Sequence, residues 1–206
     1  LYFEGPPAGV ALHVDDASLL LVPPVWTQSA SGIHTFTTAA NWTPASAASS
    51  SPIQPLLFFP GQPLPANPLT ITQNAAAPFL SSAIDLSGAG PAAIMLEGSP
   101  LETGALALSA QGASYTVATS LRFTGDAAVT GDGDAAFTLA GPFTSPGALR
   151  KSGASRLTLA AANDYPGATF INAGALRAAH PLALGSAASG TVVQGGAALA
   201  ALELAG

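Results

Sequence analysis

The residues that could perform catalysis or bind a metal ion are few and widely spaced. The histidines are His13, His34 and His180, and no two of them have the His-x-x-x-His spacing that places two imidazoles on one metal ion. Cysteine is absent, which excludes disulfides, thiolate chemistry and zinc sites built from cysteine. We therefore predict structural or surface roles for the histidines, and we expect no cofactor.

Two acidic clusters could bind Ca²⁺, an ion that favours carboxylate oxygens in loops. They are Asp15-Asp16 and Gly131-Asp132-Gly133-Asp134. The second has neither the EF-hand spacing nor the repeated Gly-x-Gly-x-Asp pattern of calcium-binding β-rolls. Glycine and aspartate are common in turns, because they tolerate positive φ and form local hydrogen bonds. We interpret these clusters as turns, with Ca²⁺ binding as the alternative, and predict no metal site.

The remaining carboxylates could support polysaccharide cleavage, which needs two acids at a suitable separation, or a Ca²⁺ ion with a basic residue. Arg122 could face Asp126 or Asp134, although an ordinary ion pair is the simpler interpretation. The sequence has no Gly-x-Ser-x-Gly nucleophile elbow and no phosphate-binding loop before a helix. We predict a non-enzyme, with a carbohydrate-active β-helix enzyme as an alternative. The candidate carboxylates are Asp85, Glu97, Glu102, Asp126, Asp132, Asp134, Asp164 and Glu203.

The composition excludes several classes of partner. Charged residues make up 8% of the 206 residues, against about 25% in ordinary domains. Only five are Lys or Arg and the net charge is −6, which argues against nucleic acid and anionic membrane surfaces as partners. No apolar run approaches the roughly 18 residues of a membrane helix, so we expect no membrane insertion of this segment.

Short alternating segments separated by glycine-containing turns dominate the chain after about residue 80. Apolar residues two positions apart, as in Leu106/Leu108 and Leu157/Leu159, have the period of a strand with one inward face. No long segment has the 3.6-residue period and the caps of a helix. The predicted strands are Ala83–Ser87, Ala93–Glu97, Ala105–Ser109, Tyr115–Thr119, Leu121–Thr124, Ala127–Thr130, Ala135–Ala140, Gly147–Lys151, Arg156–Ala160, Thr169–Asn172, Ala175–Ala178, Thr191–Gln194 and Ala198–Leu204.

Strand–turn units of roughly 20–25 residues without helices indicate a stacked solenoid. We therefore predict an all-β fold, a right-handed parallel β-helix (β-solenoid), in which successive turns, or rungs, pair about 4.8 Å apart. A narrow interior that accepts small aliphatic side chains and excludes charges would explain the alanine content. Asn74, Asn163 and Asn172 lie near turns, where amide side chains can complete hydrogen bonds between rungs.

The two ends of the chain depart from this pattern. Residues 6–80 are rich in proline, and we predict that they form an irregular N-terminal cap with the first rungs, because an exposed end of stacked strands invites aggregation. Residues 81–206 are predicted to be rungs. Residues 1–5, LYFEG, are similar to the remnant of a protease-cleavable tag. The pattern stops at Gly206, and we interpret the chain as truncated there from a longer protein. The bulky residues of the predicted cap are Trp26, Phe36, Trp42, Phe58, Phe59 and Phe79.

One segment, LRKSGASRLTLAAANDYPGATFINAGAL, resembles a known module. Its pattern of Leu-x-Lys-x-Gly, Leu-x-Leu, Asn-x-Tyr-x-Gly and Thr-x-Ile-x-x-Gly-x-Leu is similar to the autotransporter-associated β-strand repeat, or passenger-associated transport repeat, of bacterial surface proteins. We place the motif at residues 147–178. The matching residues are Leu149, Lys151, Gly153, Leu157, Leu159, Asn163, Tyr165, Gly167, Thr169, Ile171, Gly174 and Leu176. Departures from the family pattern are Ser155 for Gly, Asp164 and Pro166 for Thr, and Ala168 for Gly.

The resemblance implies roles for some of these residues. Lys151, the sole lysine, is expected to lie outward at a turn, and Tyr165 is expected to pack in a turn. A covalent bond from Lys151 to Asn163 or Asn172 is a further alternative that the family does not imply. In the family an opening segment with two tryptophans often precedes the repeats, and Trp26 with Asn41-Trp42 is similar.

The resemblance also implies a function. It predicts a non-catalytic, secreted passenger segment at the bacterial cell surface, associated with the outer membrane. There it would act as a rigid stalk or scaffold that assists passenger folding and secretion, joined to downstream parts of a longer chain. The lack of cysteine fits threading through a narrow pore. An adhesin module that binds a host protein or glycan is the alternative, with the loops at Leu56–Leu69 as the expected binding surface. The oligomeric state stays open.

Overall fold

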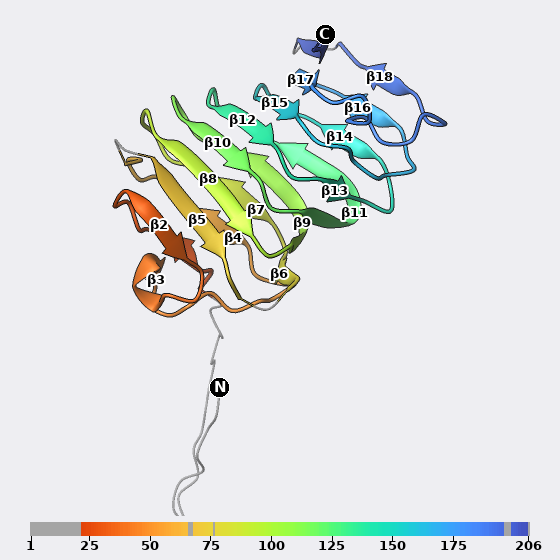
Figure 1. Cartoon of the computed structure of the whole chain (residues 1–206). Helices are drawn as coiled ribbons and strands as arrows, with labels where there is room; N and C mark the ends of the chain where they lie inside the picture. The colour runs from red at the N-terminus through yellow and green to blue at the C-terminus, as the bar shows by residue number, and fades with distance from the viewer. Residues whose placement is uncertain (1–21, 66–67, 76, 196–198, 206) are drawn as a thin grey trace, which may run out of the picture.

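The computed structural model describes residues 22–65, 68–75, 77–195 and 199–205. These residues form a parallel β-solenoid of about six turns, with two sheets on opposite sides of the interior (Figure 1). The predicted all-β parallel solenoid is confirmed, and its right-handed winding stays a prediction. The predicted tag remnant at 1–5 and the predicted cap residues 6–21 lie outside the described residues, as do His13 and Asp15-Asp16.

Each rung contributes a strand to both sheets. Strands in the first sheet follow the order β18 (Thr191–Val193), β16 (Thr169–Ile171), β14 (Leu149–Lys151), β11 (Leu121–Thr130), β9 (Leu101–Leu108), β7 (Ile84–Leu86), β4 (Leu56–Phe58), β1 (Val25–Trp26) and β3 (Trp42–Thr43). Two short strands extend it, β13 (Phe143–Thr144) beside β11 and β6 (Phe79–Ser81) beside β9. The second sheet follows the order β19 (Ala200–Leu204), β17 (Gly174–Ala178), β15 (Arg156–Leu159), β12 (Ala136–Leu139), β10 (Ser114–Val117), β8 (Ala93–Gly98), β5 (Leu69–Gln73) and β2 (Gly32–Thr35).

Successive rungs are held in register. In the first sheet one inward position is occupied in turn by Leu106, Val129, Lys151, Ile171 and Val193, each paired with the next. Neighbours in this column are 23, 22, 20 and 22 residues apart, which matches the period predicted from the sequence. Because the side chains of a strand alternate between faces, a constant register keeps each column wholly inside or wholly outside the solenoid.

Every strand predicted from Ala83 onward has a counterpart in the structure. The sequence indicated the third, shorter face of the rungs at one strand only, the predicted Leu121–Thr124. On this face Phe79, Leu101, Leu121 and Phe143 stack in register, on β6, the first part of β9, the first part of β11, and β13. On β6, β9 and β13 the segments on this face are only two or three residues long, which is too short for a period of two to be recognised.

One strand bends between two faces. Residues 121–124 and 127–130 were predicted as separate strands, but they form the single strand β11 with a register shift between Phe123 and Ala128. The extra residues, Gly125 and Asp126 among them, form a bulge, which bends a strand without ending it. The first half of β11 therefore lies on the third face and the second half in the main sheet.

Large apolar side chains fill the interior. The predicted narrow interior of small aliphatic residues is only partly correct, because most inward columns hold Leu, Ile, Val or Phe. Aromatic rings stack from rung to rung: Phe143 lies 5.3 Å from Tyr165 at an interplanar angle of 10°, and Tyr115 lies 6.0 Å from Phe137 at 18°. Close packing of such rings adds stabilisation beyond the burial of their area.

The described N-terminal end is closed by aromatic residues and a reversed strand. After β2 and the short 3₁₀ helix η1 (Ala39–Asn41), β3 pairs antiparallel with β1, the only antiparallel pair among the described strands. Trp26 and Trp42 pack edge to face at 4.9 Å, and the Trp42 indole Nε1 donates a hydrogen bond to the Phe36 carbonyl. A reversed strand on the edge of β1 blocks continuation of the parallel stack.

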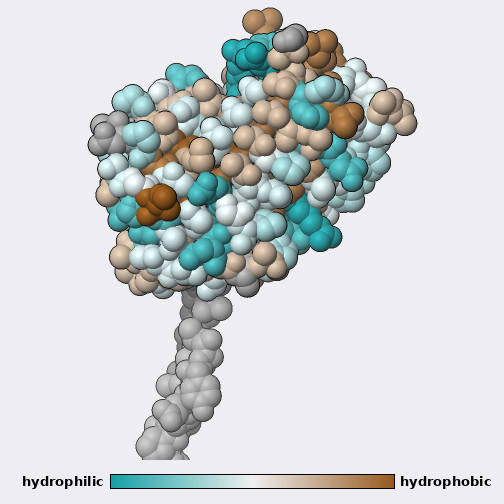
Figure 2. Space-filling view, in the orientation of Figure 1, coloured by the Kyte–Doolittle hydropathy of each residue, from teal (hydrophilic) through white to brown (hydrophobic). Residues whose placement is uncertain are grey.

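At the other end, β18 and β19 have a neighbour on one side only among the described strands. Several of their side chains are consequently exposed, including Val193 and Leu204. Figure 2 shows several apolar residues near this end and another strongly apolar spot at the left of the view, with polar and apolar residues mixed elsewhere. No helix among the described residues is long and apolar enough to cross a membrane.

Candidate functional site

The segment that resembles the transport repeat forms β14 to β17, two consecutive rungs of the solenoid. Its aliphatic residues all point inward and are fully buried: Leu149, Leu157, Leu159, Ile171 and Leu176. Gly167 and Gly174 lie against the backbone of the preceding rung, with no room for a Cβ.

Gly153 in the β14–β15 turn shows why glycine is needed in this segment. It has a φ of +76°, and a Cβ there would collide with the Gly131 carbonyl of the rung before. The turn therefore combines a left-handed backbone with a close approach between rungs.

Lys151 is buried inside the solenoid, so the prediction that it lies outward is wrong. It occupies the inward column between Val129 and Ile171, and its side chain is fully excluded from solvent. The aliphatic stem takes the place of an apolar residue. The ammonium nitrogen Nζ turns back to donate hydrogen bonds to the carbonyls of Ser152, at 2.9 Å, and Gly153, at 2.8 Å. These charge-assisted bonds compensate for removal of the amine from water.

Burial has an electrostatic consequence for this amine. It lowers the pKa of Lys151 to about 8, and the nearby carboxylate of Asp132 opposes that shift. No bond from Lys151 to Asn163 or Asn172 is present in the described structure, because the amine is directed to the turn carbonyls.

Asn163 connects three successive rungs. Its side chain is buried, its Oδ1 accepts a hydrogen bond from the Phe143 backbone N–H at 3.0 Å, and its Nδ2 donates to the Ala183 carbonyl at 2.8 Å. Asn74 bonds in the same manner to Thr37 of the preceding rung. The prediction that asparagines complete hydrogen bonds between rungs is thus confirmed for these two residues, whereas Asn172 is exposed.

Tyr165 is buried in the turn before β16. Its hydroxyl lies 2.6 Å from the Thr169 hydroxyl, and its ring stacks on Phe143. Thr169 is buried as well, so the two polar groups satisfy each other. Burial raises the pKa of Tyr165, and the Thr169 hydrogen bond partly offsets this rise.

Three aspartates that the sequence left as turn residues or candidate acids bind neighbouring rungs. Asp126 accepts a hydrogen bond from the Ala148 N–H at 2.9 Å, Asp132 from Ala154 at 2.7 Å, and Asp134 from Gly112 at 2.6 Å. In each pair the residues are 22 positions apart, which is about one rung. That coincidence with the repeat period is the signal by which the sequence could have revealed them.

The ion pairs differ from those expected. Arg122 pairs with Glu102 at 3.5 Å and with neither Asp126 nor Asp134. Asp126 instead pairs with Arg150 at 2.6 Å, and the Ala148 N–H together with the Arg150 guanidinium lowers the pKa of Asp126. Arg122 and Glu102 face each other because their strands are in register.

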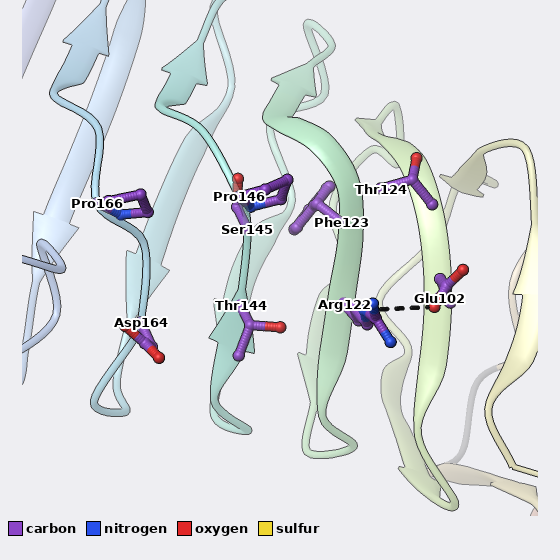
Figure 3. A pocket seen from close by; sticks show the side chains of 9 residues that line it. All are labelled: Glu102, Arg122, Phe123, Thr124, Thr144, Ser145, Pro146, Asp164 and Pro166. Atoms are coloured by element: carbon purple, nitrogen blue, oxygen red, sulfur yellow. Dashed lines mark ion pairs between the residues drawn. The ribbon is translucent and has the colours of Figure 1, made fainter.

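A groove crosses the rungs on the outer side of the bend between the third face and the first sheet (Figure 3). Its main part has a volume of about 630 Å³, and an adjoining hollow of about 350 Å³ shares Glu102 and Thr124 with it. Two rows of outward-facing positions line the groove. One row consists of Leu80, Glu102, Arg122, Thr144 and Asp164, which pair in register on consecutive rungs. The second row, two residues further along each rung, consists of Ser82, Gly104, Thr124, Pro146 and Pro166.

This groove does not have the geometry of a two-carboxylate glycosidase. Glu102 and Asp164 are the carboxylates that line it, and three rungs separate them. Three rung spacings amount to about 14 Å, whereas paired catalytic carboxylates lie about 5–9.5 Å apart. Among the described residues, no group of three His, Asp or Glu side chains is placed to hold a metal ion.

The loop region expected to bind a partner buries its apolar residues. Leu56, Phe58, Phe59, Leu64 and Leu69 are all in the core, so the described part of the Leu56–Leu69 segment does not present them as an exposed patch. The sequence could not show this, because proline-rich segments can be exposed loops or tightly packed turns. His34 lies in β2 and is bonded to the Ala30 carbonyl, and His180 accepts a bond from the Leu182 N–H in a turn.

Comparison with known proteins agrees with the resemblance found in the sequence. Residues 149–178 match the family described as the Passenger-associated-transport-repeat. No curated protein and no solved structure matches the chain significantly. The match covers β14 to β17, whose buried lysine, asparagine and tyrosine were described above. Residues 149–178 therefore form a passenger-associated transport repeat within a parallel β-solenoid, as in an autotransporter passenger repeat protein.

Proposed function

We propose that this chain is a non-catalytic passenger segment that serves as a rigid stalk or scaffold at the bacterial cell surface. The repeat family supports a secreted location outside the outer membrane. The observation that carries the scaffold role is the continuous network of hydrogen bonds between rungs, to which side chains contribute at turn after turn.

Side chains join neighbouring rungs along much of the stack. Asp134, Asp132 and Asn163 bond to backbone groups of adjacent rungs, and Ser189 donates to the Pro166 carbonyl of the rung before. Strand pairing alone would leave the turns free to open. Side-chain bonds at the turns fix the rotation of each rung on the next, and this favours a stiff rod.

The stack also supports a role in folding during secretion. Each rung contacts mainly its neighbours, so a rung that emerges can add to those already formed. The repeat supplies three buried polar side chains, of which Lys151 and Tyr165 bond within their own rung and Asn163 bonds to the rungs on both sides. We propose that the Asn163 bonds make addition of the neighbouring rungs specific in register.

The absence of cysteine permits a direct test of stiffness. Thr70 and Arg177 lie in one outward column of the second sheet, five strand steps apart. Spin labels at Thr70→Cys and Arg177→Cys should give one narrow distance distribution near 24 Å, five times the strand spacing. A broad or bimodal distribution in the folded protein would rule out a rigid rod.

A second label pair serves as a matched control. Met95 lies in the same column and is one strand step closer to Arg177 than Thr70 is. The pair Met95→Cys and Arg177→Cys should give a distribution of the same width with its centre shorter by about 5 Å. A shift of any other size would show that the labels do not follow the rung spacing.

A further inference from the structure

The groove lined by Glu102, Arg122, Thr144 and Asp164 has features of a binding site for a linear polymer. Its two rows of side chains repeat at the strand spacing of about 4.8 Å, so the groove presents an equivalent position on each rung. From Leu80 to Asp164 the first row spans four steps, or about 19 Å. A ligand that lies along the solenoid axis can contact every rung in turn (Figure 3).

The bend of each rung produces this concave shape. Between the two rows, the residues Ser81, Thr103, Phe123, Ser145 and Tyr165 turn inward and are buried. Several of their hydroxyls bind backbone carbonyls at the bend, such as Thr103 to Ala105 at 2.9 Å and Ser145 to Gly125 at 2.8 Å. The groove is therefore held open by internal bonds, and binding would require no rearrangement of the backbone.

The polar groups in the groove are available to a ligand. Among the described residues, Arg122 forms an ion pair only with Glu102, and its side chain keeps 69% of its surface exposed. Within the described part of the chain, the side-chain oxygens of Thr124, Thr144 and Asp164 make no hydrogen bond to protein groups. Carboxylate, guanidinium and hydroxyl groups thus alternate along one wall, offering both acceptors and donors.

This chemistry selects among linear polymers. An extended peptide gains affinity by adding to a strand edge, but the first parts of β9 and β11, beneath the middle of the groove, are paired on both sides. A polyanion would meet Glu102 and Asp164 with only Arg122 to attract it, in a chain of net charge −6. Sugar hydroxyls both donate and accept, and an extended pyranose unit advances by about one rung spacing.

From these observations we infer that the groove binds a neutral, linear oligosaccharide that lies along the solenoid axis. Phe123, the one aromatic residue among the described residues that line the groove, is buried, so most of the affinity comes from hydrogen bonds that compete with water. The dissociation constant is expected to be on the order of 1 mM. This binding site is independent of the scaffold role, since a stiff stack without a ligand would still serve as a stalk.

The test is a titration of the intact chain with cellopentaose, a neutral β-1,4-linked pentamer, followed by amide NMR shifts. Saturable shifts are expected at residues 122–124, 144 and 164. Arg122→Ala should weaken binding about tenfold, the effect of losing a charged hydrogen bond. Arg177→Ala is the matched control, because this arginine is exposed on β17, away from the groove, and its loss should leave binding unchanged.

Parallel titrations identify the outcomes that would overturn the inference. They use a galacturonate pentamer as an acidic glycan and a proline-rich decapeptide as an extended peptide. Stronger binding of either probe than of cellopentaose would refute a site for neutral glycan. Three other outcomes would also refute it. They are amide shifts outside the groove, an equal loss of affinity in both arginine variants, and no amide shift at saturating cellopentaose.

Discussion

The ammonium nitrogen of Lys151 lies 2.8 Å from the carbonyl oxygen of Gly153, inside the solenoid. The only lysine of the chain is thus a core residue that binds the turn following its own strand. The same turn requires a left-handed backbone at Gly153 and packs against the rung before it. Lysine and glycine in this spacing therefore act as one unit, in which the side chain of one stabilises the backbone conformation of the other.

Removal of the buried amine should destabilise the fold to an extent that depends on the replacement. Lys151→Ala loses both hydrogen bonds and leaves a cavity, and it should lower the free energy of unfolding by about 3 kcal/mol. Lys151→Met keeps most of the apolar stem and removes the desolvated charge, so the loss should be about 1 kcal/mol. Urea unfolding followed by circular dichroism measures both. If neither variant changed the free energy of unfolding, the Lys151 side chain would have to lie in solvent, and this prediction would be wrong.

The lowered pKa of Lys151 predicts an unusual gain of stability in mild alkali. The folded pKa is about 8 and the unfolded value 10.5. Between these values the unfolded chain binds more protons than the folded chain, so stability rises with pH. From pH 7.5 to 9.5 the free energy of unfolding should increase by about 2 kcal/mol. Tyr165 does not oppose this rise, because its raised pKa affects stability only above pH 10.

Lys151→Met is the control for this pH dependence, because it has no titrating amine at this position. Its free energy of unfolding should stay flat over the same pH range. A parallel increase in both proteins would assign the effect to another group.

Asp126 should contribute to stability only above the acid range. Its folded pKa is lowered by the Ala148 N–H and by Arg150, so its contribution is complete above the unfolded value of 3.8. The contribution is lost as the pH falls through the lower folded pKa. Asp126→Asn should therefore flatten the fall in stability between neutral pH and the acid range. Thermal unfolding midpoints at a series of pH values test this, and unchanged acid sensitivity would contradict it.

Asn163 should contribute more to the stability of the fold than an exposed asparagine does. Asn163→Ala would leave the Phe143 N–H and the Ala183 carbonyl without partners in the interior, at a cost of about 2–4 kcal/mol. Amide exchange at Phe143 should accelerate in the variant. The control is Asn172→Ala, an exposed asparagine nine residues further along, whose replacement should change stability by less than about 0.5 kcal/mol. Similar losses in both variants would show that Asn163 does not connect the rungs.

The sequence by itself determined the strands and their stacking. Leu157 and Leu159, or Leu106 and Leu108, reveal a strand with one inward face, and the recurrence of such pairs every 20–25 residues specifies a solenoid. Local alternation and glycine-containing turns carry this information, since both depend on the nearest residues only. The transport repeat was recognisable for the same reason, because its glycines and leucines occupy fixed places within one rung.

The tertiary structure decided which polar residues are buried and which meet across rungs. Alternation places Lys151 on the face shared with Leu149, yet a lysine is ordinarily outward, and only the nearby turn carbonyls make its burial tolerable. The pairing of Arg122 with Glu102 depends on register between rungs, which the lengths of the intervening turns set. The groove likewise arises from bends that stack in space, and no single rung encodes it.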